Sequence, residues 1–387
     1  MLLSTVHRPP STALSVAVVM VMINAIPLAA QEPVERVRLA EPEATLAEPF
    51  SDVAGVRELS DGTVLVTDML ERALRRVSFT RGGVDELGHV GQGPGEYQMP
   101  GDLLRLPGDS TLMVDFGNMR LSVVSPDGEL TGSESLMRPD GLFMNPQGVD
   151  AEGRIYFEVS GVSRMATSGE DLPDSSVIVR YDRGSGAVDT VGTVSLPAIG
   201  RVSTQGGFSF ASAGGGPFQA VDAWGVSLDG RIAVVRHEGY HVEWSQAGNR
   251  KVIGPEVYYR PVEVSDEDKE AWADRMSGAR VSISRNDGSS GRSMSLPRPD
   301  LDQMDFPEYK PAFQRRGVVV TPEGEVWVQR YVEYGEPETY DVFDAQGRRV
   351  KQVTLPEGRE FVGFGNGVLY AVYADQDDLQ WLERYRR

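Results

Sequence analysis

Two short segments combine a carboxylate with cationic or amide side chains at the spacing of a tight loop. Asp68 is followed by Arg72, and Asp115 is followed by Asn118 and Arg120. Two carboxylates at one site could act as general acid and general base. An aspartate beside an arginine could equally form an ion pair that fixes a loop. Both interpretations stay open, and the five residues are candidates for ligand binding.

Histidine and tyrosine gather in the stretch VVRHEGYHVEW, which carries Arg236, His237, Tyr240 and His241. Two histidines four residues apart would share one face of a helix and could bind a metal ion. The flanking residues indicate two strands joined by a turn, where this spacing does not define how the two rings lie. We therefore predict ligand binding by Arg236, His237 and Tyr240 and no metal site.

Further candidates are Glu158, Arg330 and Tyr331. Arg330 and Tyr331 lie in VQRYVEY, and Glu158 lies in FEVS. Tyrosine and arginine are enriched where proteins bind other molecules. These residues suit a carbohydrate, a peptide or a protein surface, and they equally suit packing inside a folded domain.

A glycine-rich run, GHVGQGPGEYQMPGD, covers residues 88–102. Such a run can hold a phosphate when it opens a helix, because the first amides of the helix bind the anion. Here Glu96 adds a negative charge, Pro94 lacks an amide hydrogen, and the residues that follow indicate a strand. The run is predicted to be a connector between strands.

Short apolar strands between glycine turns make up most of the chain, with almost no helical periodicity. One unit recurs: a polar turn with glycine, an alternating apolar strand, a gap and a second apolar strand. The turn glycines are Gly62, Gly108, Gly153, Gly230, Gly324 and Gly367. Three of the intervals between them match the ~40–50 residues of a four-stranded propeller blade, and two carry insertions. The sequence predicts an all-β fold, a six-bladed β-propeller of four-stranded antiparallel blades, as one domain over residues 31–387.

The last repeat ends at Arg387 after three strands, so its outermost strand is missing. An unpaired sheet edge favours aggregation. The segment VERVRLA, residues 34–40, lies upstream of the first blade and belongs to no repeat. We expect residues 34–40 to supply the missing strand of the last blade and so to close the ring.

The long loops should lie on one face of the propeller. Strands alternate in direction from the axis outward, so second-to-third-strand loops and blade-to-blade connections share a face. This group contains all the long segments: residues 160–176, 195–219, 255–312, 331–338 and 374–380. We call the face of the propeller that carries these segments the long-loop face, and we expect the functional site there.

Insertions are expected at about residues 195–219 and 255–312. In the second, SDEDKEAW predicts a short helix with Ser265 as its cap. This insertion is interpreted either as a lid over the ring or as a disordered addition.

Composition limits the classes of partner. The formal net charge is −19, which disfavours binding to nucleic acid or to anionic lipid. There are no cysteines, so disulfides and thiolate chemistry are excluded. Residues 1–30 combine Arg8, an apolar run and small residues, which predicts a signal peptide. We expect an exported monomer, in the periplasm or outside the cell.

The stretch GQGPGEYQMPGDL with LMVDFGNMRLSVVSPDGEL resembles an NHL-type repeat of the six-bladed propeller superfamily. The matching residues are Gly91, Gly93, Gly95, Glu96, Tyr97, Pro100, Asp115, Asn118 and Arg120. The chain is also similar to exported bacterial six-bladed propellers. The resemblance implies the fold and leaves the chemistry undetermined.

Related six-bladed propellers include calcium-dependent lactonases and an amidating lyase whose zinc is held by histidines. Asn118 is the one asparagine well placed for such a calcium site, and His89, His237 and His241 do not suggest a three-histidine zinc site. No cofactor is expected, and calcium is the candidate ion if one binds.

Three functions remain from the sequence. The favoured one is an exported binding protein that recognises a protein, peptide or carbohydrate ligand on the long-loop face. The alternative is a hydrolase or lyase with acidic residues at the mouth of the channel, with or without a divalent cation. The third is a structural role in the cell envelope.

Overall fold

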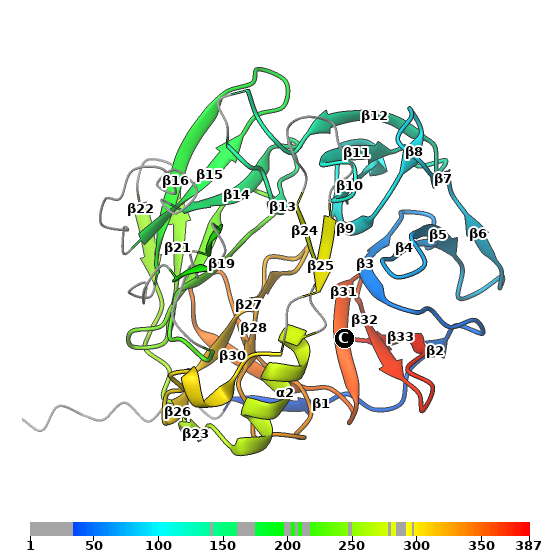
Figure 1. Ribbon diagram of the computed structural model, residues 1–387. Coiled ribbons are helices and arrows are strands. Elements are labelled where there is room, and N and C mark those ends of the chain that lie inside the picture. The colour runs from blue at the N-terminus through cyan, green and yellow to red at the C-terminus, as the bar shows by residue number, and fades with distance from the viewer. Residues whose placement is uncertain are drawn as a thin grey trace, which may run out of the picture. The chain divides into compact units, whose positions relative to one another are not determined.

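The structure is a computed structural model of the chain (Figure 1). It describes residues 34–139, 142–160, 175–196, 203–205, 208–210, 217–246, 250–277, 280–283, 292–295 and 298–387. The predicted signal peptide, residues 1–30, lies outside the described residues. Across the described ranges, no helix is long and apolar enough to cross a membrane.

Six antiparallel sheets follow one another along the described part of the chain, and we number them as blades 1 to 6. Blade 1 contains β3 (Val53–Glu58), β4 (Val64–Asp68), β5 (Ala73–Val77) and β6 (Val84–Glu86). Blade 2 contains β9 (Pro100–Arg105), β10 (Thr111–Asp115), β11 (Arg120–Val124) and β12 (Leu130–Ser135). Blade 3 contains β13 (Pro146–Val149), β14 (Ile155–Ser160), β15 (Ser175–Tyr181) and β16 (Val188–Ser195).

The second half of the chain repeats this pattern. Blade 4 contains β19 (Ala223–Val226), β20 (Ile232–Arg236), β21 (His241–Gln246) and β22 (Arg250–Ile253). Blade 5 contains β27 (Phe313–Val320), β28 (Val326–Arg330), β29 (Thr339–Phe343) and β30 (Arg349–Thr354). Blade 6 contains β31 (Arg359–Phe364), β32 (Val368–Ala374) and β33 (Gln380–Arg386).

The first strands of the blades, which we call the inner strands, lie next to one another around an axis (Figure 1). β3 contacts β9 and β31, β9 contacts β13, β13 contacts β19, and β19 contacts β27. Blades 5 and 6 share a hydrophobic cluster that includes Trp327, Tyr340 and Tyr385. The sheets therefore form a closed ring, and the predicted six-bladed β-propeller is confirmed.

The second strand of a blade is covered on both faces by the neighbouring blades. Every residue of β4 and of β10 is buried, which explains why VLVTD and TLMVD have apolar side chains on both faces of the strand. The turn glycines Gly62 and Gly230 have φ of +79° and +78°, a conformation that L side chains rarely adopt.

Closure of the ring differs from the prediction for residues 34–40. β1 (Glu35–Arg38) pairs in parallel with β30 and so adds a fifth strand to blade 5. The outermost strand of blade 6 is β2 (Ala44–Thr45), which pairs antiparallel with β33. The prediction that an N-terminal strand completes the last blade is right, but its assignment to residues 34–40 is wrong. Both segments cover an open edge, and Pro42, which has no N–H to donate, lies between them.

The long segments connect the strands as expected. They join β14 to β15, β16 to β19, β22 to β27, β28 to β29, and β32 to β33. The smaller elements in the connections are β7 (His89–Val90), β8 (Glu96–Tyr97), η1 (Pro107–Asp109), β17 (Ser203–Gln205), β18 (Phe208–Phe210), β23 (Val262–Glu263), α2 (Asp266–Ser277), β24 (Arg280–Ile283), β25 (Arg292–Ser295), η2 (Leu301–Gln303) and β26 (Tyr309–Lys310).

The predicted helix is present as α2 and is longer than SDEDKEAW. The Ser265 backbone N–H donates to the Asp268 carboxylate at 3.0 Å, and the Asp268 N–H donates to the Ser265 hydroxyl at 3.2 Å. This reciprocal cap satisfies two amides at the start of the helix. Asp268 is buried and also pairs with the buried Lys310 ammonium at 2.6 Å, which fixes α2 to the end of its own insertion.

Candidate functional site

Five of the six inner strands contain a β-bulge near the end that starts on the long-loop face. In blade 2, Gly101 and Asp102 together oppose the single residue Val114 of β10. A bulge leaves a residue outside the ladder and redirects its side chain. The residues in the five bulges are Ala54, Gly101–Asp102, Gln147, Gln314–Gly317 and Val362.

Three of these bulges carry exposed polar side chains. Asp102, Gln147 and Arg316 are exposed, although the faces of their strands are covered by the neighbouring blades. The charge of Arg316 acts on the Asp102 carboxyl, so these two side chains, which come from blades 5 and 2, approach each other across the axis. We call Asp102, Gln147, Arg315 and Arg316 the axial site.

Asp102 and Arg316 are the charged pair of the axial site. Blades 2 and 5 lie opposite each other in a six-membered ring, so β9 and β27 face each other across the axis. The inner strands around the Asp102 carboxyl remove part of its hydration, which raises its pKa, and the positive charge of Arg316 offsets part of that effect. Within the described residues, neither side chain makes a hydrogen bond or an ion pair.

Arg315, next to Arg316, is already paired. Its Nη2 lies 2.6 Å from Oε1 of Glu158, whose other oxygen accepts a hydrogen bond from Trp224 Nε1 at 3.2 Å. Ser176 Oγ also donates to Glu158. Glu158, a sequence candidate on β14, therefore lies beside the axial site and neutralises one of its two arginines.

The blade 1 candidates are placed apart from each other. Asp68 is fully buried at the end of β4 and accepts backbone N–H groups of Ser51 at 2.7 Å and Glu71 at 2.9 Å. Its nearest arginine is Arg75, at 3.9 Å, and not Arg72. Arg72 is exposed with φ of +55°.

In blade 2, Asp115, Asn118 and Arg120 are brought together around one loop. The buried Asp115 carboxylate accepts hydrogen bonds from the backbone N–H of Gln98 at 3.1 Å and of Met99 at 3.0 Å. It also accepts one from Asn118 Nδ2 at 2.7 Å and lies 3.4 Å from Arg120 Nε. These contacts favour the loop-fixing interpretation of the three residues.

The glycine-rich run is confirmed as the connector between blades 1 and 2. Asn118 Nδ2 donates to the Gly91 carbonyl at 2.9 Å, and Arg120 Nη2 donates to the Gly93 carbonyl at 3.2 Å. The Glu96 carboxylate accepts the Gly93 N–H at 2.6 Å. A carboxylate of the chain thus occupies the amide that a phosphate would need, and no helix follows the run.

In blade 4, Arg236 and His237 converge on Asp222. Burial opposes ionisation of Asp222, but hydrogen bonds from Ser195, His237 and Arg236 outweigh it and lower the pKa of Asp222 to about 2. His237 Nδ1 lies 2.9 Å from Asp222 Oδ1 and 3.2 Å from Ser195 Oγ. A Ser–His–Asp triad needs the serine and the aspartate on different ring nitrogens. Here both contact Nδ1, so the group is not a triad.

Tyr240 and Arg330 meet in a buried network between blades 4 and 5. The Tyr240 hydroxyl donates to Asp341 Oδ2 at 2.9 Å, and Arg330 Nη1 donates to the same oxygen at 2.8 Å. The Arg330 guanidinium lies 5.4 Å from the centres of the Tyr240 and Tyr259 rings. Both candidates are buried, and their contacts hold the two blades together.

Tyr331 lies beneath the second insertion. Its ring is 5.5 Å from that of Phe218, which is 6.4 Å from Phe306, and Phe306 is 5.8 Å from Trp272 of α2. Burial raises the pKa of the Tyr331 hydroxyl. This aromatic chain anchors the insertion on the long-loop face, where the sequence suggested a lid.

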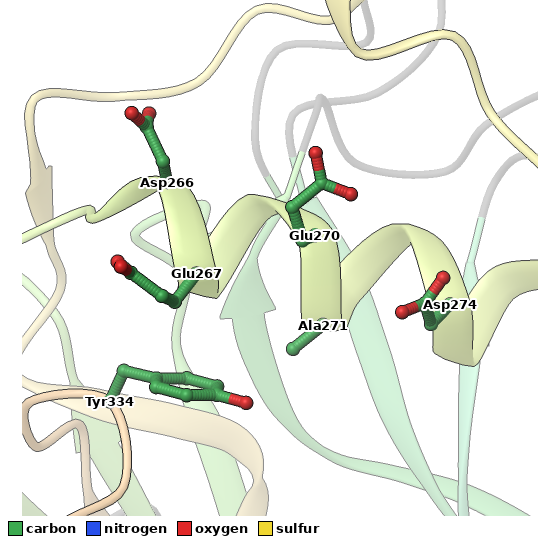
Figure 2. A pocket seen from close by; sticks show the side chains of 6 residues that line it. All are labelled: Asp266, Glu267, Glu270, Ala271, Asp274 and Tyr334. Carbon is green, nitrogen blue, oxygen red and sulfur yellow. The ribbon is translucent and has the colours of Figure 1, made fainter.

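A shallow hollow of about 510 Å³ lies between α2 and Tyr334 of the connection from β28 to β29. Figure 2 shows its lining, with Ala271 pointing toward the ring of Tyr334 and Asp266 and Glu270 pointing away from it. Glu270 pairs with Arg298, as does Asp274 at 2.9 Å. The acids of this hollow are thus partly neutralised by the insertion itself.

Within the described residues, the histidines and carboxylates that the sequence suggested lie in separate groups. The residues described contain no group of three or more histidine, aspartate or glutamate side chains that could hold a metal ion. Asp115 and Asn118 are committed to each other and to backbone groups. His237 and His241 contact different acids, Asp222 and Glu243.

Sequence reasoning missed Asp102, Gln147, Arg315 and Arg316. Their signal was present in the sequence, because GDLL, PQGV and FQRRGVVV contain polar residues where the strand of a blade should be apolar. Most of the sequence candidates lie at the ends of the second strands or in the loops after them, whereas Asp102, Gln147, Arg315 and Arg316 lie on the inner strands.

The chain resembles solved structures only distantly. A calcium-binding protein, regucalcin, from Agrobacterium tumefaciens shares 13% identity at a TM-score of 0.42, over 92% of this chain and 97% of that one. Virginiamycin B lyase from Staphylococcus aureus shares 10% identity at a TM-score of 0.39, and the match covers 89% of this chain and 87% of that one. A protein of Bacteroides fragilis that is described as exported shares 12% identity at a TM-score of 0.46, and the match covers 92% of this chain and 94% of that one. No protein-family model matches the chain, and no curated protein does. At such low identity these neighbours, some of them enzymes, carry no conclusion about function.

Proposed function

We propose that this protein is an exported, monomeric binding protein that takes a small polar ligand at the axial site of its long-loop face. One observation carries the proposal: bulges in three inner strands, which surround the axis (Figure 1), carry the exposed side chains of Asp102, Gln147 and Arg316. Bulges that redirect side chains are frequent next to functional sites.

The contrast with the other polar residues supports this choice. Asp68, Asp115, Asp222 and Asp341 all end in satisfied hydrogen-bond networks that fix loops or neighbouring blades. Asp102 and Arg316 make no such bonds among the described residues. Side chains held on rigid strands and left without partners are suited to bind a ligand without rearrangement.

The second candidate is a hydrolase or lyase that uses Asp102 as general acid or base. It is favoured by the raised pKa of the Asp102 carboxyl, since groups that transfer protons often have pKa values shifted toward neutrality. Under this alternative, Asp102→Asn abolishes turnover and leaves ligand affinity within a few-fold of the original.

A ligand screen tests the proposal. The unfolding temperature of the purified full-length protein is measured with a panel of amino acids, short peptides, sugars and sugar acids. The affinity of each compound that raises this temperature is then measured by titration calorimetry. We expect Arg316→Gln to weaken binding about ten- to a hundredfold, because a charge-assisted hydrogen bond contributes ~1.5–3 kcal/mol. The control is Arg81→Gln, an exposed arginine at the turn between β5 and β6. Equal binding by both variants would contradict an axial site.

A further inference from the structure

We infer that the axial site recognises a zwitterion, a small molecule with a carboxylate and an ammonium group such as a free amino acid or a short peptide. This inference rests on the proposed function and adds the chemical class of the ligand.

The free charges of the axial site are one of each sign. Arg315 is neutralised by Glu158 at 2.6 Å, so Arg316 and Asp102 are the cation and the anion of the axial site that make no hydrogen bond or ion pair among the described residues. They come from opposite blades, so they can contact opposite ends of one ligand. An arginine fork binds a carboxylate through two parallel hydrogen bonds, and an aspartate accepts hydrogen bonds from an ammonium group.

A ligand with one kind of charge fits this arrangement less well. An anion would pair with Arg316 but meet the like charge of Asp102, and the protein as a whole carries a net charge of −19. A cation would meet Arg316. A zwitterion satisfies both groups and adds no net charge to the site. Gln147, on β13 in blade 3, can donate to the carboxylate or accept from the ammonium.

A neutral sugar fits less well for a different reason. Sugars commonly stack on an exposed aromatic ring, and the described inner strands present none to the axis. Trp224 and Phe313 are buried, and the Phe361 and Phe364 rings pack against each other at 4.7 Å. The strongly exposed aromatic residues, Tyr258 and Tyr334, lie in the connections instead.

The test compares three matched probe sets by titration calorimetry with the full-length protein. The sets are free amino acids, their N-acetyl derivatives, which lack the cation, and their amides, which lack the anion. We expect the wild-type protein to bind at least one free amino acid tenfold or more tightly than either derivative. Asp102→Asn should remove the preference over the N-acetyl form, and Arg316→Gln should remove the preference over the amide.

Matched controls are Asp85→Asn and Arg81→Gln, exposed residues of blade 1, which should leave all affinities unchanged. The crossed pattern separates a role in recognition from damage to the fold, because a structural defect would weaken all three probe sets together. If the sugars or sugar acids of the screening panel bind as tightly as the free amino acids, the zwitterion inference fails and the proposed function stands. If no probe of any class binds, the proposed function itself fails.

Discussion

Buried aspartates close the second strands of blades 1 and 2, and their carboxylates organise the loops that follow. The Asp115 carboxylate is the clearest case, because its contacts with Gln98, Met99, Asn118 and Arg120 join two strand ends and the connector before them. Such a residue contributes mainly to stability.

We predict that Asp115→Ala lowers the free energy of unfolding by about 3 kcal/mol, because it leaves buried donors and Arg120 without their acceptor. Urea unfolding followed by tryptophan fluorescence measures the loss. Asp127→Ala removes the same charge from an exposed turn and should change stability little. A similar small effect at both positions would mean that the Asp115 network does not stabilise the loop.

A second residue-scale prediction concerns acid. The pKa of Asp222 is about 2 in the folded protein, against 3.8 for an ordinary aspartate. A lowered pKa stabilises the fold above the unfolded value, and this contribution disappears as the pH falls through the folded value. We expect Asp222→Asn to be about 2 kcal/mol less stable than wild type at pH 6, with the difference vanishing between pH 4 and pH 2. Thermal unfolding across this pH range measures the difference, and a constant gap would contradict the prediction.

Spacing along the sequence was sufficient to group Asp115, Asn118 and Arg120, because residues that are near in sequence also lie near in space in a tight hairpin. It was not sufficient to find Asp102 and Arg316. They are brought together by ring closure and by bulges, and a bulge depends on the packing of the neighbouring blades more than on its own residues.

At the scale of elements, the inner strands approach one another so closely that several positions have no room for a side chain. A Cβ added to Gly55 on β3 would lie 2.8 Å from the carbonyl oxygen of Gly101 and 2.9 Å from the Leu103 nitrogen on β9. A Cβ added to Gly225 on β19 would lie 2.9 Å from a methyl group of Val320 on β27. Glycine in these strands therefore permits the narrow centre of the ring.

We predict that Gly55→Ala destabilises the protein by about 2 kcal/mol, because backbone atoms of the next blade cannot move aside as a flexible side chain would. The matched control is Gly132→Ala on β12, where an added Cβ meets no atom within 4 Å. Chemical denaturation of both variants is the measurement. Equal stability of the two would show that β3 and β9 can separate at little cost.

The elements themselves were largely predictable. Alternating apolar runs and glycine turns predict strands because both depend on the local chain. The predicted α2 helix was recognisable from Ser265 and the acids of its first turn. The way this insertion packs on the propeller could not be recognised from the sequence. It depends on the buried pair Asp268–Lys310 and on aromatic contacts with Phe218, which is far away in sequence.

At the scale of the molecule, two short strands from the N-terminal side hold the ends of the ring. β1 lies on blade 5 and β2 on blade 6, so one segment spans the junction where the chain closes on itself. The sequence predicted that a strand was missing from the last blade. It could not assign the residues, because both candidate segments are short and strand pairing between distant segments leaves no mark in their own pattern.

Stepwise truncation tests which strand closes the ring. A chain that starts at Pro42 lacks β1, and blade 5 keeps its other four strands. A chain that starts at Ala47 also lacks β2 and the buried Leu46, which exposes the edge of β33. Relative to a chain that starts at Val34, we expect a modest loss of stability for the chain that starts at Pro42.

For the chain that starts at Ala47 we expect a further loss of at least about 2 kcal/mol, because the burial of Leu46 and the pairing of β2 with β33 are both lost. The exposed β33 edge should also cause association, detectable by sedimentation, since an unpaired edge recruits strands of other molecules. If the chain starting at Pro42 already shows the full loss, β1 and not β2 is the strand that closes the propeller.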